Sequence, residues 1–156
     1  MSVLDLPDNR KPHLILISGW VLGNASWHAL IPALKGRFQV HLFALPGYES
    51  AEDARSFDET VCAFVDALPA NATVCGWSLG AEIALAMAAR APGRIHRLVL
   101  VGGTPRFTMA HDWPDAQPPS MLATFAASVA ADAYTALQRF AALINQRDAK
   151  ARQITR

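Results

Sequence analysis

Short apolar runs alternate with longer segments of mixed character along the chain as far as residue 101. Each apolar run has the length of one strand, and continuous apolar character is typical of strands buried on both faces of a parallel sheet. The runs that we expect to form strands are residues 12–19, 38–43, 72–77 and 94–101. The last connection, residues 79–90, has the pattern of an apolar helix. This order predicts a parallel sheet with helices on its faces.

The other two connections also carry helix signals. Residues 56–68 have apolar side chains at helical spacing, with Ser56 at the N-cap and Glu59 at the third helical position, as in a capping box. Between the first two strands the pattern leaves two alternatives open. Asn24 can cap a helix at once, or Pro32 can delay the start of the helix.

Composition changes after Pro105, where prolines interrupt the pattern and two Ala-rich helical stretches follow, residues 120–131 and 132–145. No strand pattern returns in this part of the chain. We therefore expect two regions, a sheet-containing core over residues 1–106 and a helical region over residues 107–156.

Composition excludes several classes of protein. The 156 residues are 52% apolar and 17% charged, which is enough apolar content for a packed core and too much for a disordered chain. The 14 basic and 13 acidic residues give a net charge of +1, which argues against a nucleic-acid partner. Apolar stretches of about ten residues are half of what a membrane span needs. We expect no membrane association.

The sequence also gives expectations about location, cysteines and cofactors. Residues 1–8 contain two acids and no basic segment, so we expect no signal peptide and a cytoplasmic location. Cys62 and Cys75 lack the spacing of a zinc site or a redox pair and are predicted to be buried free thiols. The histidines are dispersed and no phosphate-binding glycine loop is present, so we expect neither a metal nor another cofactor.

One motif carries chemistry. Gly76-Trp77-Ser78-Leu79-Gly80 matches G-x-S-x-G between a predicted strand and a predicted helix, where a tight turn exposes a nucleophilic serine. The backbone amide of Leu79 and that of Trp20, just after the first strand, are candidates for an oxyanion hole. The alternative interpretations are an ordinary loop at Ser78 and a core aromatic side chain at Trp20.

Several segments together resemble the α/β-hydrolase superfamily in order and spacing. They are Ser18-Gly19-Trp20, Leu45-Pro46-Gly47-Tyr48, the motif around Ser78, and the strand at residues 94–101. With Asp112-Trp113-Pro114, they resemble more specifically the pimeloyl-acyl-carrier-protein methyl ester carboxylesterases of biotin synthesis. The resemblance implies a three-layer α/β fold with a helical cap, of which the chain contains the N-terminal part and the start of the cap.

The resemblance also implies roles for individual residues. Ser78 would be the nucleophile of a serine carboxylesterase, and the Trp20 and Leu79 amides would bind the oxyanion. The partner would be an acyl-carrier protein, contacted by Arg139 in a basic region that also contains Arg147 and Arg152. The residues expected to line the substrate site are Trp20, Phe140, Ala141, Ala142, Leu143 and Ile144.

The sequence departs from the family in three respects. Ser18 stands where the family usually has histidine, and Glu49 where a glycine is common. Only His96 and His111 follow Ser78, and neither stands where the family has its general base. The usual acid and base are therefore expected to be absent, together with later strands, which would leave an apolar edge on the fourth strand.

These departures keep alternative functions open. The chain can be a hydrolase of the same fold that acts on another ester, a lactone or a thioester. It can also be an inert fragment that binds an acyl chain or a carrier protein without turnover, or a chain that needs a second polypeptide to supply the acid and base.

Overall fold

The computed structural model describes residues 11–48 and 56–146. The leader, Glu49, Arg147 and Arg152 lie outside these ranges. The chain forms two compact units, Met1–Pro105 and Arg106–Arg156.

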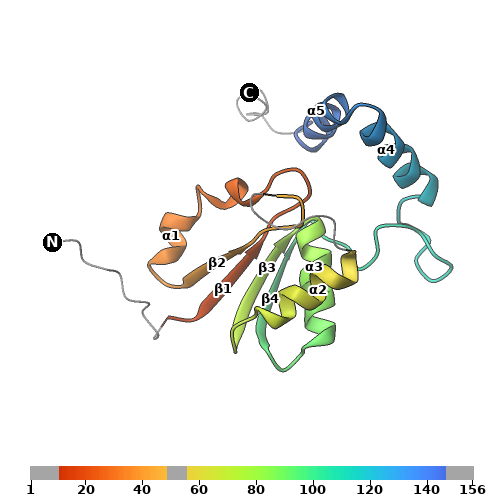
Figure 1. The fold of residues 1–156 in the computed structure, drawn as a ribbon. Helices are drawn as coiled ribbons and strands as arrows, with labels where there is room; N and C mark the ends of the chain where they lie inside the picture. The colour runs from red at the N-terminus through yellow and green to blue at the C-terminus, as the bar shows by residue number, and fades with distance from the viewer. Residues whose placement is uncertain (1–10, 49–55, 147–156) are drawn as a thin grey trace. The chain divides into compact units, whose positions relative to one another are not determined.

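The first unit has the strand and helix order that the sequence predicts (Figure 1). Its elements are β1 (His13–Ile17), η1 (Asn24–Trp27), α1 (Ile31–Lys35), β2 (Gln39–Phe43), α2 (Phe57–Asp66), β3 (Ala72–Trp77), α3 (Leu79–Arg90) and β4 (Ile95–Val101). For the first connection, the delayed start of the helix at Pro32 is confirmed, whereas Asn24 as the N-cap was wrong, because Gly23 takes that position and no side chain caps the turn. A 3-10 turn begins at Asn24, and a short α-helix with Pro32 in its first turn follows.

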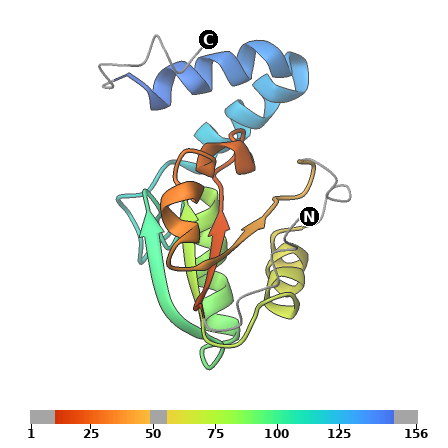
Figure 2. The same cartoon turned by 90° about the vertical axis from the view of Figure 1, so that its left-hand side faces the viewer.

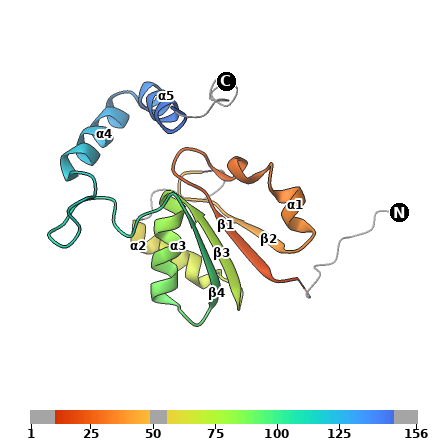
Figure 3. The ribbon, with the colours of Figure 1, turned by 180° about the vertical axis from the view of Figure 1, so that it is seen from behind.

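The four described strands form one parallel sheet in the order β2-β1-β3-β4. Figure 3 shows β4 at one edge and β2 at the other. Val99, Leu100 and Val101 of β4 are 41% to 45% exposed. Because successive strand residues point to opposite faces, β4 lacks cover on both faces at this end. The expected apolar edge is therefore confirmed within the described sheet.

Apolar side chains cover both faces of the sheet, which makes the fold three-layered as expected. On one face, Ile15 and Val74 pack with residues of α2 and α3, including Val61 and Met87. On the other face, Leu14 and Leu16 pack with Trp27 and with Leu34 of α1. Figure 2 shows α1 in front of the strands and α3 behind them.

Helix α2 begins with the predicted capping box. The Ser56 hydroxyl accepts a hydrogen bond from the Glu59 amide at 3.2 Å, and the Glu59 carboxylate accepts one from the Ser56 amide at 2.8 Å. These two bonds satisfy amides that the helix leaves without partners. The start of α2 is thus fixed by local sequence.

The expectation of two buried thiols was wrong. Cys62 is exposed, because its neighbour Val61 takes the core-facing position of α2 and the next residue points about 100° away. Its sulfur atom accepts a hydrogen bond from Nη1 of Arg90 at 2.7 Å. Cys75 is half-buried, and burial raises the pKa of its thiol.

The second unit contains the two expected helices, α4 (Pro119–Ala131) and α5 (Ala133–Ile144). Asp132 caps α5 by accepting a hydrogen bond from the Thr135 amide at 3.1 Å. Hydrogen bonds from the Thr135 side chain and then from its amide lower the pKa of the Asp132 carboxyl group. The rings of Phe125 and Phe140 join the two helices at a centroid distance of 5.7 Å. No helix in the described residues is both long and apolar enough to span a membrane.

Two histidines pair across the strands β1 and β2. Nδ1 of His13 and Nε2 of His41 lie 3.0 Å apart, so one ring donates a hydrogen bond to the other. Burial lowers the pKa of His41, and the neighbouring His13 lowers it further. The pair therefore favours an uncharged imidazole in the folded chain.

This pair predicts a pH-dependent stability. The folded pKa of His41 lies below its unfolded value, so the unfolded chain binds more protons as the pH falls through about 6.5. The stabilisation should be complete above that pH and lost below it. Urea unfolding between about pH 7.5 and 5.5 should show a steeper loss of unfolding free energy in wild type than in His41→Phe.

The control is His28→Phe, which changes an exposed histidine and retains the pair. It should follow the wild-type pH dependence. Equal slopes for wild type and His41→Phe would contradict the assignment.

Candidate active site

Ser78 occupies a strained turn between β3 and α3. It is the only residue between the strand, which ends at Trp77, and the helix, which begins at Leu79. Its φ of 54° and ψ of −120° are unfavourable for a residue with a side chain. Its amide donates to the Val101 carbonyl at 2.9 Å, and its carbonyl accepts from the Ala81 amide at 2.8 Å. The half-buried Ser78 is thus held by its main chain.

Two glycines make this turn possible. A Cβ atom at Gly76 would lie 2.1 Å from the Gly80 carbonyl oxygen, and one at Gly80 would lie 2.3 Å from the Ile17 carbonyl oxygen. No side chain can be accommodated at such distances from backbone atoms. The two glycines of the motif are therefore required by packing between β3, α3 and the end of β1.

The loop after β1 also reaches Ser78. A Cβ atom at Gly19 would lie 3.2 Å from Ser78 Cβ and 3.8 Å from Ser78 Oγ. Trp20 follows directly and is half-buried. Ser18, before Gly19, is fully buried, and its hydroxyl has no hydrogen-bond partner in the part of the chain that the structure describes. The geometry thus brings together the segments that contain Trp20, Ser78 and Leu79, while the amide roles stay predictions.

Leu79 is the first residue of α3, so its amide belongs to the helix N-terminus beside Ser78. The first amides of a helix lack partners within the helix, and the helix dipole places a partial positive charge there. This end of α3 is suited to stabilising negative charge that develops near the serine.

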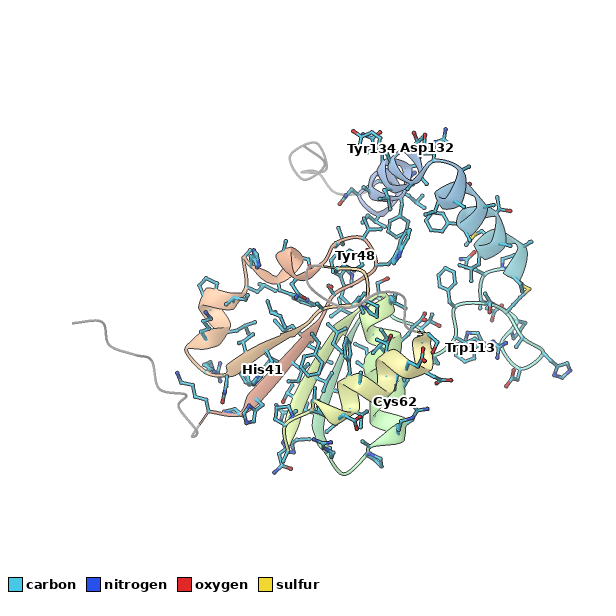
Figure 4. All side chains as sticks on the ribbon, viewed as in Figure 1. His41, Tyr48, Cys62, Trp113, Asp132 and Tyr134 are labelled. Atoms are coloured by element: carbon cyan, nitrogen blue, oxygen red, sulfur yellow. The ribbon has the colours of Figure 1, made fainter. Side chains whose placement is uncertain are left out.

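One feature of the site escaped sequence reasoning. The Tyr48 hydroxyl accepts a hydrogen bond from the Val21 amide at 2.6 Å, in the same loop as Trp20. The Pro46-Gly47 pair predicts a turn before Tyr48, but no local pattern predicts what its side chain contacts. Figure 4 shows Tyr48 beside the loop that follows β1, and His41 towards the other end of the sheet.

His96 is not placed as a base for Ser78 by the geometry of the first unit. His96 lies near the start of β4, whereas the Ser78 amide bonds to Val101 at its end. Val101 lies five positions after His96, which is roughly 16 Å at about 3.3 Å per residue. His111 belongs to the second unit. Within the described residues of the first unit, no hydrogen bond joins Ser78 Oγ to a histidine.

The remaining predicted residues lie on α5. Arg139 is exposed and Phe140 is half-buried against Phe125. Leu143 and Ile144 are 58% and 43% exposed. Ala141 is half-buried and Ala142 is exposed. The segment thus presents apolar side chains on a helix surface together with one cation.

The described residues include no group of three or more histidine, cysteine, aspartate or glutamate side chains placed to hold a metal ion.

The sequence model of the alpha/beta hydrolase fold matches residues 12–148, which is most of the chain. The chain belongs to the α/β-hydrolase family.

Curated α/β-hydrolase relatives carry a more specific name. A pimeloyl-[acyl-carrier protein] methyl ester esterase of Nitrosomonas europaea is 37% identical over 134 residues, covering 85% of this chain and 53% of the relative. One of Aromatoleum aromaticum is 39% identical over 155 residues, covering 94% of this chain and 61% of the relative. The chain thus spans little more than half the length of these relatives.

Solved α/β-hydrolase structures agree in fold. The enol-lactonase from Burkholderia xenovorans LB400 matches with a TM-score of 0.76 at 21% identity, covering 95% of this chain and 56% of that protein. The esterase from Exiguobacterium antarcticum matches with a TM-score of 0.73 at 17% identity, covering 84% of this chain and 53% of that protein. At these identities the likeness concerns the fold alone.

The packing at the serine turn of this α/β-hydrolase predicts the effect of one added methyl group. Gly76→Ala should lower the free energy of unfolding by about 3 kcal/mol or more, because the new Cβ overlaps the Gly80 carbonyl. Urea denaturation measures the loss. Gly36→Ala is the matched control, since nothing lies within 4 Å of a Cβ there. An equal effect of both substitutions would contradict the close approach.

Proposed function

We propose that the chain carries the nucleophile and the oxyanion hole of a serine carboxylesterase. The observation that carries the proposal is the strained position of Ser78 at the start of α3. The loop after β1 comes close to this serine, since a Cβ atom added at Gly19 would lie 3.2 Å from Ser78 Cβ. A serine held above a sheet, beside a helix N-terminus and a second loop, has the arrangement that acyl transfer requires.

In the proposed reaction, Ser78 Oγ attacks the carbonyl carbon of an ester and transfers its proton to a base. The carbonyl oxygen becomes an oxyanion, which the amides of Trp20 and Leu79 stabilise. The tetrahedral intermediate collapses to an acyl-enzyme while the base gives its proton to the leaving oxygen, which departs as the neutral alcohol, methanol for a methyl ester. Water then attacks the acyl-enzyme, releases the acid and returns the proton to Ser78.

The proposed substrate is the methyl ester of pimeloyl-acyl-carrier protein. The names of two relatives, which are 37% and 39% identical to this chain, support this choice. In this proposal Trp20 and the α5 residues line the alkyl chain, and Arg139 contacts the acidic carrier protein. The α5 residues are Phe140, Ala141, Ala142, Leu143 and Ile144. Support comes from the exposure of Leu143, Ile144 and Arg139.

A second candidate function is binding of an acyl chain or a carrier protein without turnover. The observation that favours it is the lack of a hydrogen bond between Ser78 and any histidine in the described residues of the first unit. Removing the base of a serine hydrolase typically costs several orders of magnitude in rate. In the esterase proposal, an acid and a base must therefore reach Ser78 from outside the described residues of the first unit.

Covalent labelling separates the two functions. If Ser78 is an activated nucleophile, a fluorophosphonate probe should label the folded wild-type chain and leave Ser78→Ala unlabelled, as read by intact-protein mass spectrometry. Ser128→Ala is the matched control, since it removes a hydroxyl that bonds only within α4. It should label like wild type. Folded wild type without label would overturn the esterase proposal and support binding alone.

The substrate proposal has its own test. Arg139→Glu should weaken binding of an acidic acyl-carrier protein by about tenfold at low salt, because the substitution replaces attraction with repulsion. Titration by fluorescence anisotropy measures this change. Arg97→Glu, an exposed arginine on β4, makes the same change of charge elsewhere and should have the smaller effect. Equal effects of both would contradict a contact at Arg139.

A further inference from the structure

The loop that contains Trp20 includes a residue in an unfavourable backbone conformation. Val21 has a φ of 77°, in the left-handed region that glycine adopts readily and a β-branched side chain resists. A residue in such a conformation is strained and persists only where its surroundings hold it. Something must therefore fix Val21, directly after the candidate oxyanion donor.

The side chain of Tyr48 is placed to do so. Its hydroxyl accepts the hydrogen bond from the Val21 amide at 2.6 Å. Its ring lies against the same loop, with Cδ1 3.5 Å from the position of a Cβ at Gly23. Tyr48 thus contacts the loop at two points, and one of them is the peptide group that joins Trp20 to Val21.

Tyr48 is itself held firmly. Pro46 and Gly47, with a φ of 80° at Gly47, form the centre of a turn closed by the bond from the Tyr48 amide to the Leu45 carbonyl at 3.2 Å. Leu45 is only 4% exposed, and the Tyr48 ring packs against the same apolar core. The core therefore holds the turn after β2 in place, and Tyr48 of this turn holds the loop after β1.

We propose that Tyr48 is a positioning residue, which orients the Trp20 amide for oxyanion binding by holding Val21 in its left-handed conformation. Without the hydroxyl, Val21 would relax towards negative φ and rotate the adjoining peptide, which moves the loop beside Ser78. This inference rests on the proposed function for its catalytic meaning. The loop geometry that it invokes is independent of any reaction.

The experiment compares Tyr48→Phe with wild type by two measurements. In amide NMR spectra, Tyr48→Phe should shift the Val21 and Trp20 resonances and speed hydrogen exchange at Val21. In fluorophosphonate labelling, it should lower the rate about three- to tenfold, as expected from the loss of one neutral hydrogen bond. Tyr134→Phe, which changes a tyrosine 72% exposed on α5, is the matched control and should alter neither measurement.

A rescue variant distinguishes positioning from a general loss of structure. Glycine adopts positive φ without cost, so Val21→Gly should restore most of the labelling rate in the Tyr48→Phe background. A destabilised chain would not recover, because glycine adds unfolded-state entropy.

The outcomes separate the inference from the proposed function. Unchanged Val21 and Trp20 resonances in Tyr48→Phe overturn the inference, and so does a labelling loss that Val21→Gly fails to restore. If wild type is not labelled, the proposed function fails. In that case, the NMR shifts and the exchange rate at Val21 still test whether Tyr48 positions the loop.

Discussion

The close crossing of β3, α3 and the end of β1 is the constraint on which the first unit depends. Backbone atoms fill the positions that side chains at Gly76 and Gly80 would occupy, so the main chains of three elements pack directly. The chain must leave the strand and enter the helix within one residue, and Ser78 takes the left-handed φ. Hydrogen bonds to Val101 and Ala81 hold it there. The serine is therefore positioned by packing that involves none of its own side-chain atoms.

The candidate site residues and the histidines lie in different parts of the parallel sheet. The carboxyl ends of β1, β2 and β3 lead into the Trp20 loop, the Tyr48 turn and Ser78, because loops that follow parallel strands gather at one edge of the sheet. His13 and His96 lie at the amino ends of β1 and β4, and His41, in the middle of β2, pairs with His13. The candidate groups for attack and for charge stabilisation thus meet at one edge of the sheet, and these three histidines lie away from it.

Features fixed by local physics could be predicted from the sequence, and those fixed by distant contacts could not. The strand β1 was evident because burial on both faces requires an unbroken apolar run, and the capping box of α2 involves residues three apart. Ser78 stands in a motif whose glycines have a steric purpose. The bond from Val21 to Tyr48 spans 27 residues and opposes the backbone preference of valine. The outward position of Cys62 depends equally on the packing of α2 as a whole.

The backbone angles of Ser78 have a consequence for evolutionary change. The unfavourable φ arises from the Cβ atom, which every residue except glycine possesses, so the strain is nearly independent of the chemical group beyond it. Cysteine or aspartate at this position would meet the same backbone with a similar cost. The architecture of the turn can therefore be retained while the side chain at Ser78 is exchanged, and a single codon change can replace the proposed nucleophile without requiring a new fold.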